Sequence, residues 1–481
     1  MMSKIDNSTK KLLGGSAVYF VGNALTQLIS LLLMRFVTGN VTPEEYGFFN
    51  LVTTVSNLVI PIVTLQISDA VFKFVLKSET EDEKRSYISV CLVVSVISVC
   101  IIFASVFALS CFLSIPHTLL VALYVSSYAL IGVYQKITRC LNKNKVFVTG
   151  NLLKTVIFLS LEIALISALD MGIEALLWAH IISLAFALIY TEIRIRALKY
   201  FSFTALNRRV FAQMMRFSIP LIPNAIFWWL TSSVNSVIVS ARLGMDVNGI
   251  YAVSAKFTGV LVMVTSVLNM SWQDTAIADY GNKDFGAFLT KTFNMYVKLI
   301  FSAIAVLLPF IALILPYMID PTYYDAIPYT PFLMMASGTS AMSGFVAQIF
   351  TGKGQTKTLL TTSIFGMIAN VTVVFLFVGN LGLWAAVLGS LAADVVLFTS
   401  RTVLARKEFA KGIDYKSFLI VFVMLVVGSV IYLLGTPIYN LIWLGISVAV
   451  AVILNWRFVC DLFTVLFGGL MKKKRGKRDA E

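Results

Sequence analysis

Residues 84–108 read KRSYISVCLVVSVISVCIIFASVFA, in which two basic residues precede a long apolar run. A hydrocarbon core about 30 Å thick is crossed by a helix of about 20 apolar residues. The run at 87–108 has that length and carries no charge, so it predicts a transmembrane helix. Because Lys and Arg stay on the cytoplasmic side, Lys84 and Arg85 predict that this helix begins at the cytoplasmic face.

The same pattern recurs on both sides of this stretch and predicts about 14 transmembrane helices. The expected spans are 12–34, 46–68, 87–108, 115–136, 147–168, 172–193, 217–241, 249–270, 293–315, 327–350, 358–378, 381–401, 416–434 and 438–460. Of the 38 Lys and Arg residues, 33 lie on one side of these spans, in alternate gaps and in the two terminal segments. The expected fold class is therefore an all-α, multi-pass integral membrane protein with both termini in the cytoplasm, an N-in/C-in topology.

The composition fits this fold class, with 58% hydrophobic residues, 13% charged residues and a mean hydropathy of +0.87. The net charge of +14 lies in short loops and in the C-terminal tail. It does not follow a groove with interleaved aromatic residues, so anionic membrane lipids are the expected partner and nucleic acid is not. Five cysteines without paired spacing and two distant histidines indicate no metal site. Residues 352–357 (GKGQTK) lack the spacing of a phosphate-binding loop, so no catalytic residue, enzyme activity or cofactor is expected.

A weak internal repeat divides the chain. Residues 46–49 (YGFF) open span two, and residues 248–251 (NGIY) open span eight about 202 positions later. Spans one to six and seven to twelve are expected to be two pseudo-symmetric six-helix lobes with the same orientation, an arrangement found in transporters. The expected domains are an N-lobe at 1–200, a C-lobe at 201–412, two extra helices at 413–470 and a basic cytoplasmic tail at 471–481.

Ionisable residues inside spans are the first candidates for function, because a charge at mid-membrane faces a wet cavity or a partner. The residues in this group are Lys154 and Glu162 in span five, Lys256 in span eight and Asp394 in span twelve. Asp69 and Lys73 form an i,i+4 pair at the inner end of span two, where simple ion pairing is an equally good interpretation. Arg35 and Arg242 are the two basic residues on the side opposite the other charged gaps.

Polar residues within apolar runs form a second group of candidates. They are Asn23, Gln27, Asn224, Trp228, Ser232, Asn235 and Asn370. Four prolines are expected to interrupt helices and permit bending around a substrate: Pro61, Pro220, Pro223 and Pro309. Each residue in these two sets is also compatible with an interhelical hydrogen bond or a simple kink.

Several short motifs occur in an order that carries a family resemblance. They are 41–47 (VTPEEYG), 216–223 (RFSIPLIP), 249–251 (GIY) followed by Lys256, Trp272 with Gln273, and 352–357 followed by Asn370 and Gly382. Together, over at least residues 12–403, they resemble the polysaccharide-transporter family, which includes the O-antigen and capsule repeat-unit flippases. That family belongs to the wider MOP superfamily, with the lipid II flippases and the MATE multidrug transporters. The chain departs from the family at Asn235 and Ser236, where members often carry an Asp-Arg pair, so a mechanism based on that pair does not carry over.

The resemblance implies a flippase with a V-shaped central cavity between two six-helix lobes. The implied substrate is an oligosaccharide repeat unit on undecaprenyl pyrophosphate, moved from the cytoplasmic to the outer leaflet of a bacterial-type cytoplasmic membrane by alternating access. The implied partners are a polysaccharide polymerase and glycosyltransferases. Cationic groups are expected to hold the pyrophosphate, and amides and aromatic faces the sugar. The cavity candidates are Lys256, Lys154, Arg35, Arg242, Asn23, Gln27, Asn224, Trp228, Asn235 and Asn370, and the coupling or ion-pair candidates are Glu162, Asp394, Asp69 and Lys73.

Other functions remain open on the residues alone. A lipid II flippase would meet the same headgroup chemistry. A drug or metabolite antiporter would require an acidic cavity, and the buried charges here are two basic and two acidic. A membrane glycosyltransferase or polymerase would need a large loop with clustered charges, and the short loops of this chain argue against it.

Overall fold

The computed structural model describes residues 30–31, 33–169, 171–279, 284–353, 355–410 and 414–456. All regular secondary structure in these ranges is helical. Twelve of the described helices are long and apolar enough to cross a membrane, and a bent pair of helices supplies a thirteenth span. The prediction of an all-α multi-pass membrane protein is therefore confirmed. Nearly all of the expected first span, with Asn23 and Gln27, and the basic tail at 471–481 lie outside the described residues.

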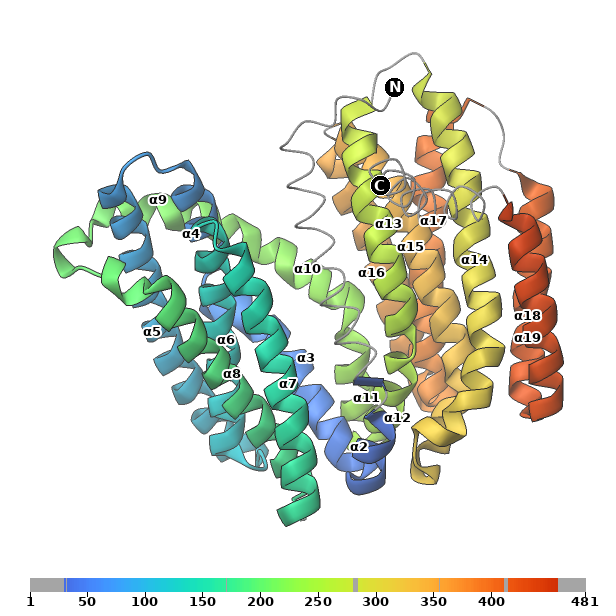
Figure 1. The fold of residues 1–481 in the computed structure, drawn as a ribbon, viewed down its shortest axis with the longest axis horizontal. Helices are drawn as coiled ribbons and strands as arrows, with labels where there is room; N and C mark the ends of the chain where they lie inside the picture. The colour runs from blue at the N-terminus through green and yellow to red at the C-terminus, as the bar shows by residue number, and fades with distance from the viewer. Residues whose placement is uncertain are drawn as a thin grey trace, which may run out of the picture. The chain divides into compact units, whose positions relative to one another are not determined.

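The described residues form two compact units. Unit one contains the described residues up to Val253, together with Ile319–Tyr323 and Val371–Ala386. Its helices are α2 (Met34–Asn40), α3 (Pro43–Val63), α4 (Ile67–Lys77), α5 (Glu81–Leu113), α6 (Thr118–Cys140), α7 (Asn144–Leu169), α8 (Ile173–Ile195), the short 3-10 turns η1 (Ala197–Tyr200) and η2 (Phe203–Ala205), α9 (Arg208–Ser218), the 3-10 turn η3 (Ile219–Leu221), α10 (Ile222–Ser232), α11 (Val234–Leu243) and most of α12 (Met245–Lys256). Figure 1 shows α9 lying across the ends of α4 and α5, against which it packs.

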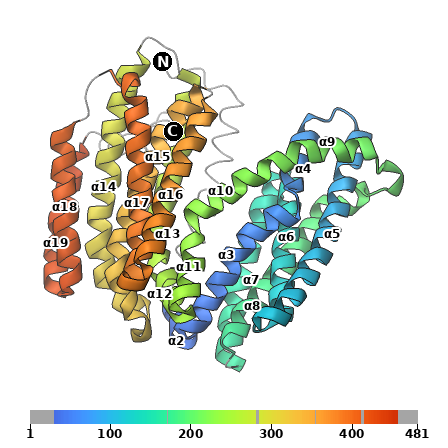
Figure 2. The ribbon, with the colours of Figure 1, turned by 180° about the vertical axis from the view of Figure 1, so that it is seen from behind.

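Unit two contains Ser254–Met318, Tyr324–Asn370 and the described residues from Val387 onward. Its elements are α13 (Thr258–Asp279), α14 (Phe285–Met318), most of η4 (Pro321–Tyr329), α15 (Thr330–Gly352), the first part of α16 (Thr356–Leu381), most of α17 (Leu383–Ala405), η5 (Arg406–Glu408), α18 (Tyr415–Leu434) and α19 (Pro437–Leu454). Figure 2 shows α18 and α19 beside α14, on which both pack. The lobe boundaries at 200 and 412 stay a prediction.

The start of α3 shows how the VTPEEYG motif builds a helix end. The Thr42 hydroxyl accepts a hydrogen bond from the Glu45 backbone N–H, and the Glu45 carboxylate accepts one from the Thr42 backbone N–H. This capping box satisfies two otherwise unpaired N–H groups, and Pro43 fits the first helical position because no partner is needed there. The second carboxylate oxygen of Glu45 accepts a bond of 3.1 Å from the Ile173 N–H, so the same side chain ties α3 to the start of α8.

Two glycines allow α3 and α12 to cross in contact. A Cβ atom on Gly47 would collide with the Met245 carbonyl oxygen, and a Cβ atom on Gly249 would collide with the Pro43 carbonyl oxygen. The contact is reciprocal, because Met245 follows Pro43, and Gly249 follows Gly47, by the same 202 positions. α3 begins at Pro43 and α12 begins at Met245, and in each helix the glycine follows one turn later. Close backbone approach through small residues is a common way for helices to associate in membranes.

Three expected spans are broken rather than continuous. Span two, expected at 46–68, is interrupted at residues 64–66 between α3 and α4. Span seven, expected as one helix at 217–241, is divided by η3, which contains Pro220, and again at Ser233 between α10 and α11. Span eight, expected at 249–270, bends by 43° between α12 and α13. Prolines explain the break at η3, since Pro220 and Pro223 remove backbone donors, but neither Ser233 nor Phe257 is a helix breaker.

The prediction that Pro309 interrupts a helix is wrong, because α14 continues past it. Pro61 lies in the last turn of α3, which ends at Val63 before the left-handed residues Leu65 and Gln66. α14 has 34 residues and packs on α15, α18 and α19, so the loss of one backbone hydrogen bond is outweighed by its many interhelical contacts.

Candidate substrate-binding site

Exposed polar and amphipathic side chains lie on the apolar helix α10 and at the end of the preceding helix α9. Arg216, Asn224, Trp228 and Ser232 are all exposed, and Trp228 is 68% exposed. Asn224, Trp228 and Ser232 follow one another at intervals of four residues along one side of α10, and Arg216 lies near the end of α9, before η3. We call these four residues the polar face. Sequence reasoning identified Asn224, Trp228 and Ser232 as candidates, but it counted Arg216 only as a basic residue of a cytoplasmic gap and as part of the 216–223 motif.

The polar face is held in place by hydrogen bonds on the other side of α10. The neighbouring Trp229 is buried, and its indole N–H donates a bond of 2.7 Å to the Thr54 carbonyl in α3. This bond fixes the rotation of α10, so Trp228 must point away from α3. At the end of the face, the Ser232 hydroxyl donates to the Trp228 carbonyl at 2.9 Å.

An open cleft lies at the Arg216 end of the polar face. It has a volume of about 390 Å³ and is lined by Ala212, Gln213, Arg216 and Phe217. The Lys73 ammonium lies over the ring of Phe217, 3.7 Å from its centroid. The Gln213 side-chain oxygen accepts a hydrogen bond of 3.3 Å from the Tyr87 hydroxyl. We call these four lining residues and Lys73 the headgroup cleft.

The expected pair of Asp69 and Lys73 does not form its ion pair within α4. The Asp69 carboxylate instead lies 2.6 Å from the Lys136 ammonium on α6. Because α4 and α6 pack against each other, this ion pair restricts both Asp69 and Lys136. Lys73 instead contacts the aromatic ring of Phe217. Among the described residues, neither Lys73 nor Arg216 has a carboxylate partner, which sets them apart from Lys136.

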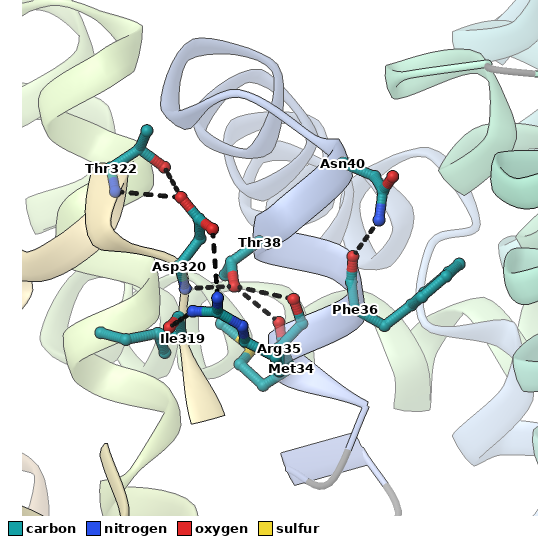
Figure 3. A network of polar contacts seen from close by, with 8 residues as sticks. All are labelled: Met34, Arg35, Phe36, Thr38, Asn40, Ile319, Asp320 and Thr322. Carbon is teal, nitrogen blue, oxygen red and sulfur yellow. Dashed lines mark hydrogen bonds and ion pairs between the residues drawn. The ribbon is translucent and has the colours of Figure 1, made fainter. Parts of the chain in front are cut away.

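Arg35 belongs to a network that Figure 3 shows at close range. Its guanidinium lies 3.6 Å from the Asp320 carboxylate and donates a hydrogen bond to the Ile319 carbonyl. The Asp320 backbone N–H donates to the Thr38 hydroxyl at 2.9 Å, and the Tyr323 hydroxyl donates to the Val41 carbonyl at 2.8 Å. This network joins α2 to the segment after α14, on the side opposite the basic gaps. Arg35 is thus an ion-paired side chain in this structure.

The two intramembrane lysines fall in different compact units. Lys154 is half-buried in α7 of unit one, and Lys256 is half-buried at the end of α12, in unit two, where span eight bends. No ion pair involves either lysine within the described part of the chain. Their assignment to a common cavity stays a prediction.

The remaining amide candidates are buried, as is typical of interhelical contacts. The Asn235 side-chain amide donates to the Ala386 carbonyl at 3.0 Å. Asn370 is 1% exposed in α16, and its side-chain oxygen has no hydrogen-bond partner among the described residues. Arg242, by contrast, is exposed on α11 and lies 5.5 Å from the centroid of the Phe375 ring. The polar-face residues are therefore better placed than Asn235 or Asn370 to meet a ligand.

The acidic candidates Glu162 and Asp394 lie in separate units. Glu162 is buried in α7. Asp394 in α17 hydrogen-bonds with Ser340 in α15 and interacts electrostatically with Arg401, two helical turns further along α17. The Arg401 guanidinium donates to Ser343, Thr362 and Ser363, and so joins α17 to α15 and α16. The sequence contains no sign of these Arg401 contacts, because Arg401 lies at the end of a span, where the positive-inside rule already predicts a cation.

The sequence comparison decides the family. The family described as "Polysaccharide biosynthesis protein" matches residues 12–277, more than half of the chain. The chain belongs to this family. No curated protein matches the sequence. The resemblance noted in the motifs is thereby confirmed. The matched region, residues 12–277, contains all residues of the polar face and of the headgroup cleft.

Solved structures show that this family member has the fold of MOP-superfamily transporters. It is similar to the lipid II flippase MurJ in an inward closed conformation, at 15% identity and a TM-score of 0.69, over 94% of this chain and 100% of that one. It is also similar to a multidrug resistance MATE transporter of the MOP superfamily in its inward-facing conformation, at 16% identity and a TM-score of 0.63, over 80% of this chain and 98% of that one. An outward-facing MATE structure matches at 16% identity and a TM-score of 0.52, over 82% and 92%. The chain thus shares the fold of the transporters and the flippase that it matches.

Proposed function

We propose that the protein is a flippase that moves undecaprenyl-pyrophosphate-linked oligosaccharide repeat units from the cytoplasmic to the outer leaflet. The observation that carries this proposal is the polar face, which exposes an amide, an indole and a hydroxyl along one side of α10 and a cation near the end of α9. Acyl chains cannot satisfy the Arg216, Asn224 and Trp228 side chains, so these groups require water or a polar ligand. A sugar supplies hydroxyls for Asn224 and Ser232 and a ring face for Trp228, and a phosphate suits Arg216.

The family supports the substrate class, because a polysaccharide biosynthesis protein with a transporter fold has a lipid-linked sugar as its natural cargo. In this proposal two six-helix lobes, 1–200 and 201–412, alternate in access to the two leaflets of a bacterial cytoplasmic membrane. Glycosyltransferases make the cargo on the inner face, and a polysaccharide polymerase uses it on the outer face. Capsule or O-antigen repeat units are the proposed cargo.

The polar face is tested in vesicles that contain the purified protein and an undecaprenyl-pyrophosphate-linked oligosaccharide. Translocation is measured as the fraction of sugar that becomes accessible to an added glycosidase. Asn224→Leu and Trp228→Ala are each expected to lower the rate about five- to thirtyfold, since each removes a polar or stacking contact worth about 1–2 kcal/mol. Trp456→Ala is the matched control, because Trp456 is an exposed tryptophan on the last described helix turn.

Unchanged rates in both polar-face variants would contradict the proposal. A protein that moves lipid II but not the oligosaccharide lipid would be a peptidoglycan-precursor flippase instead. Uptake of organic cations without lipid translocation would identify a drug antiporter.

The intramembrane lysines give a separate prediction in cells. Lys154→Ala or Lys256→Ala is expected to abolish surface polysaccharide while the protein stays in the membrane at its normal level, because the pyrophosphate loses a cationic partner. Surface polysaccharide is measured by immunoblot and protein by membrane fractionation. Normal export by both variants would exclude a role for these lysines in binding the substrate.

A further inference from the structure

The headgroup cleft contains two cations, Lys73 and Arg216, that have no carboxylate partner in the described part of the chain. Three other cations near helix ends of the described chain are ion-paired: Lys136 with Asp69 at 2.6 Å, Lys298 with Asp414 at 2.8 Å, and Lys84 with Glu81 at 2.7 Å. Lys73 instead lies over two rings, 3.7 Å from the Phe217 centroid and 5.4 Å from the Phe74 centroid, much as Arg139 lies over Phe72 and Phe147. Ring faces hold an ammonium without neutralising it, so its charge remains available to a ligand.

The donors of the cleft suit a phosphate. Arg216 carries a planar guanidinium that binds phosphate oxygens in pairs, and Lys73 adds a compact ammonium with three donors. The Gln213 side-chain oxygen is occupied by the Tyr87 hydroxyl, so its amide NH₂ is the end that can face the cleft. Among the described residues, the cleft lining includes no carboxylate that would repel an anion.

The surroundings of the cleft favour a lipid over a soluble anion. α9 buries Met214 and Met215 against unit one, while Phe211 and Ile219 remain 43% and 47% exposed beside the cleft. Exposed apolar side chains next to cations are the signature of a helix that lies in the headgroup region of a bilayer. The basic residues of this segment place it at the cytoplasmic leaflet.

We propose that the headgroup cleft is the docking site at which the diphosphate headgroup of a polyprenyl lipid is captured from the inner leaflet. Lys73 and Arg216 hold the diphosphate, Gln213 donates to it, and the attached sugar extends toward Asn224 and Trp228 along the polar face. The inference rests on the proposed function and adds to it a loading site at the cytoplasmic end of span seven. Lys73 and Arg216 act in binding, before any conformational change.

The test measures binding of undecaprenyl pyrophosphate to the full-length protein in phosphatidylcholine nanodiscs. Native mass spectrometry gives the Kd, and hydrogen exchange of the α9 amides reports whether the lipid occupies the cleft. The Lys73→Gln/Arg216→Gln double variant is expected to bind at least about 30-fold more weakly, because each cation contributes about tenfold or slightly less. Protection of the α9 amides by the lipid should be lost.

The matched control is Lys77→Gln/Arg209→Gln, which removes the same charge from exposed positions on the same two helices, α4 and α9. It is expected to change the Kd by less than about threefold, since diffuse surface charge acts weakly. Two further arms separate the sources of phosphate. Phosphatidylglycerol nanodiscs and dissolved inorganic pyrophosphate are each expected to protect α9 much less than the polyprenyl lipid does.

Wild-type affinity in the double variant, or an equal loss in the control, would overturn the assignment of the cleft. Equal protection by phosphatidylglycerol would make it a general anionic-lipid contact, and equal protection by inorganic pyrophosphate a soluble-anion site. If the wild-type protein translocates the oligosaccharide lipid while the cleft variant binds normally, only the cleft assignment fails. If the wild type neither binds nor translocates that lipid, the proposed function itself fails.

Discussion

At the scale of single residues, the presence or absence of an ion-pair partner distinguishes charged side chains with a structural role from those that can bind a ligand. Arg35 and Asp69 were both candidates from the sequence, and the structure pairs them with Asp320 and Lys136. Removing one member of a partly buried pair leaves the other uncompensated, so substitutions there report on stability as much as on function. Lys73 differs, because an aromatic ring holds it and no carboxylate is lost when it changes.

Asp414 gives a pH prediction at this scale. It caps α18, accepts hydrogen bonds from Ser417, and lies 2.8 Å from the Lys298 ammonium. The hydrogen bond from Lys298, followed by those from Ser417, lowers the pKa of Asp414 to about 2. A carboxyl with a lowered pKa stabilises the fold above its unfolded pKa of about 3.9, and this contribution is lost as the pH falls toward about 2.

Asp414→Asn is therefore expected to lower the melting temperature of the detergent-solubilised protein by about 1–2 °C at neutral pH, a small effect because the pair is partly exposed. The difference from wild type should shrink as the pH is lowered from about 4 to about 2. Asp325→Asn, at an exposed position, serves as the control. A difference that stays constant over this range would show that the carboxylate charge contributes nothing.

At the scale of elements, the sequence predicted which helices exist better than where they break. Each expected span from the second onward has a helix at its position, because a run of about 20 apolar residues has few alternatives in a bilayer. The breaks at Ser233 and Phe257 were missed, since neither residue interrupts the apolar pattern. Nothing in the local sequence marks either break.

The same reasoning explains how far the candidate site could be predicted. Asn224 and Trp228 were found because a polar or amphipathic side chain stands out within an apolar run. Arg216 was interpreted only as a sign of topology, because basic residues at span ends are expected in any membrane protein. Lys73 was interpreted as the partner of Asp69 within α4. The structure shows that the two cations share one cleft. Lys73 on α4 lies over the ring of Phe217, and Phe217 lines the cleft together with Arg216 at the end of α9.

The crossing of α3 and α12 gives a prediction for this scale. Gly47→Ala or Gly249→Ala is expected to destabilise the protein by about 2–3 kcal/mol or more, because the new methyl group meets a backbone carbonyl that cannot rotate away. The measurement is thermal unfolding in detergent, followed by the loss of monodisperse protein. Gly132→Ala is the control, since a Cβ at Gly132 would meet no atom within 4 Å, and there alanine is expected to be neutral or slightly stabilising. Equal stability of all three variants would contradict a tight crossing.

At the scale of the whole molecule, the orientation in the membrane rests on the charge count and can be tested directly. In a cysteine-free background, Lys143→Cys lies between α6 and α7 and Thr436→Cys between α18 and α19. A membrane-impermeant maleimide added to intact cells is expected to label Thr436→Cys and not Lys143→Cys, because basic gaps face the cytoplasm. Labelling after permeabilisation is the control for reactivity. The reverse pattern would invert the topology and place the headgroup cleft on the outer side.

The Arg35 network gives a second prediction at this scale. If the protein works by alternating access, contacts that join α2 to the segment around Asp320 must separate in a state open to the outer side. Bridging a Thr38→Cys/Asp320→Cys pair with a short thiol cross-linker is expected to stop surface polysaccharide export, and a reducing agent should restore it. Export by each single cysteine variant should be the same with and without the reagent. Full export by the bridged protein would show that this network stays closed throughout the cycle.

The reciprocal glycine contact also bears on how such a chain can arise. Pro43 meets Gly249 just as Met245 meets Gly47, at one constant offset. Contacts of this form, in which one patch meets its own copy, are those of a two-fold symmetric homodimer. In a dimer of a six-span chain, a single glycine per subunit would make both contacts. In a single chain each of the two sites can change separately, so unlike binding surfaces can form around a junction whose two contacts stay alike.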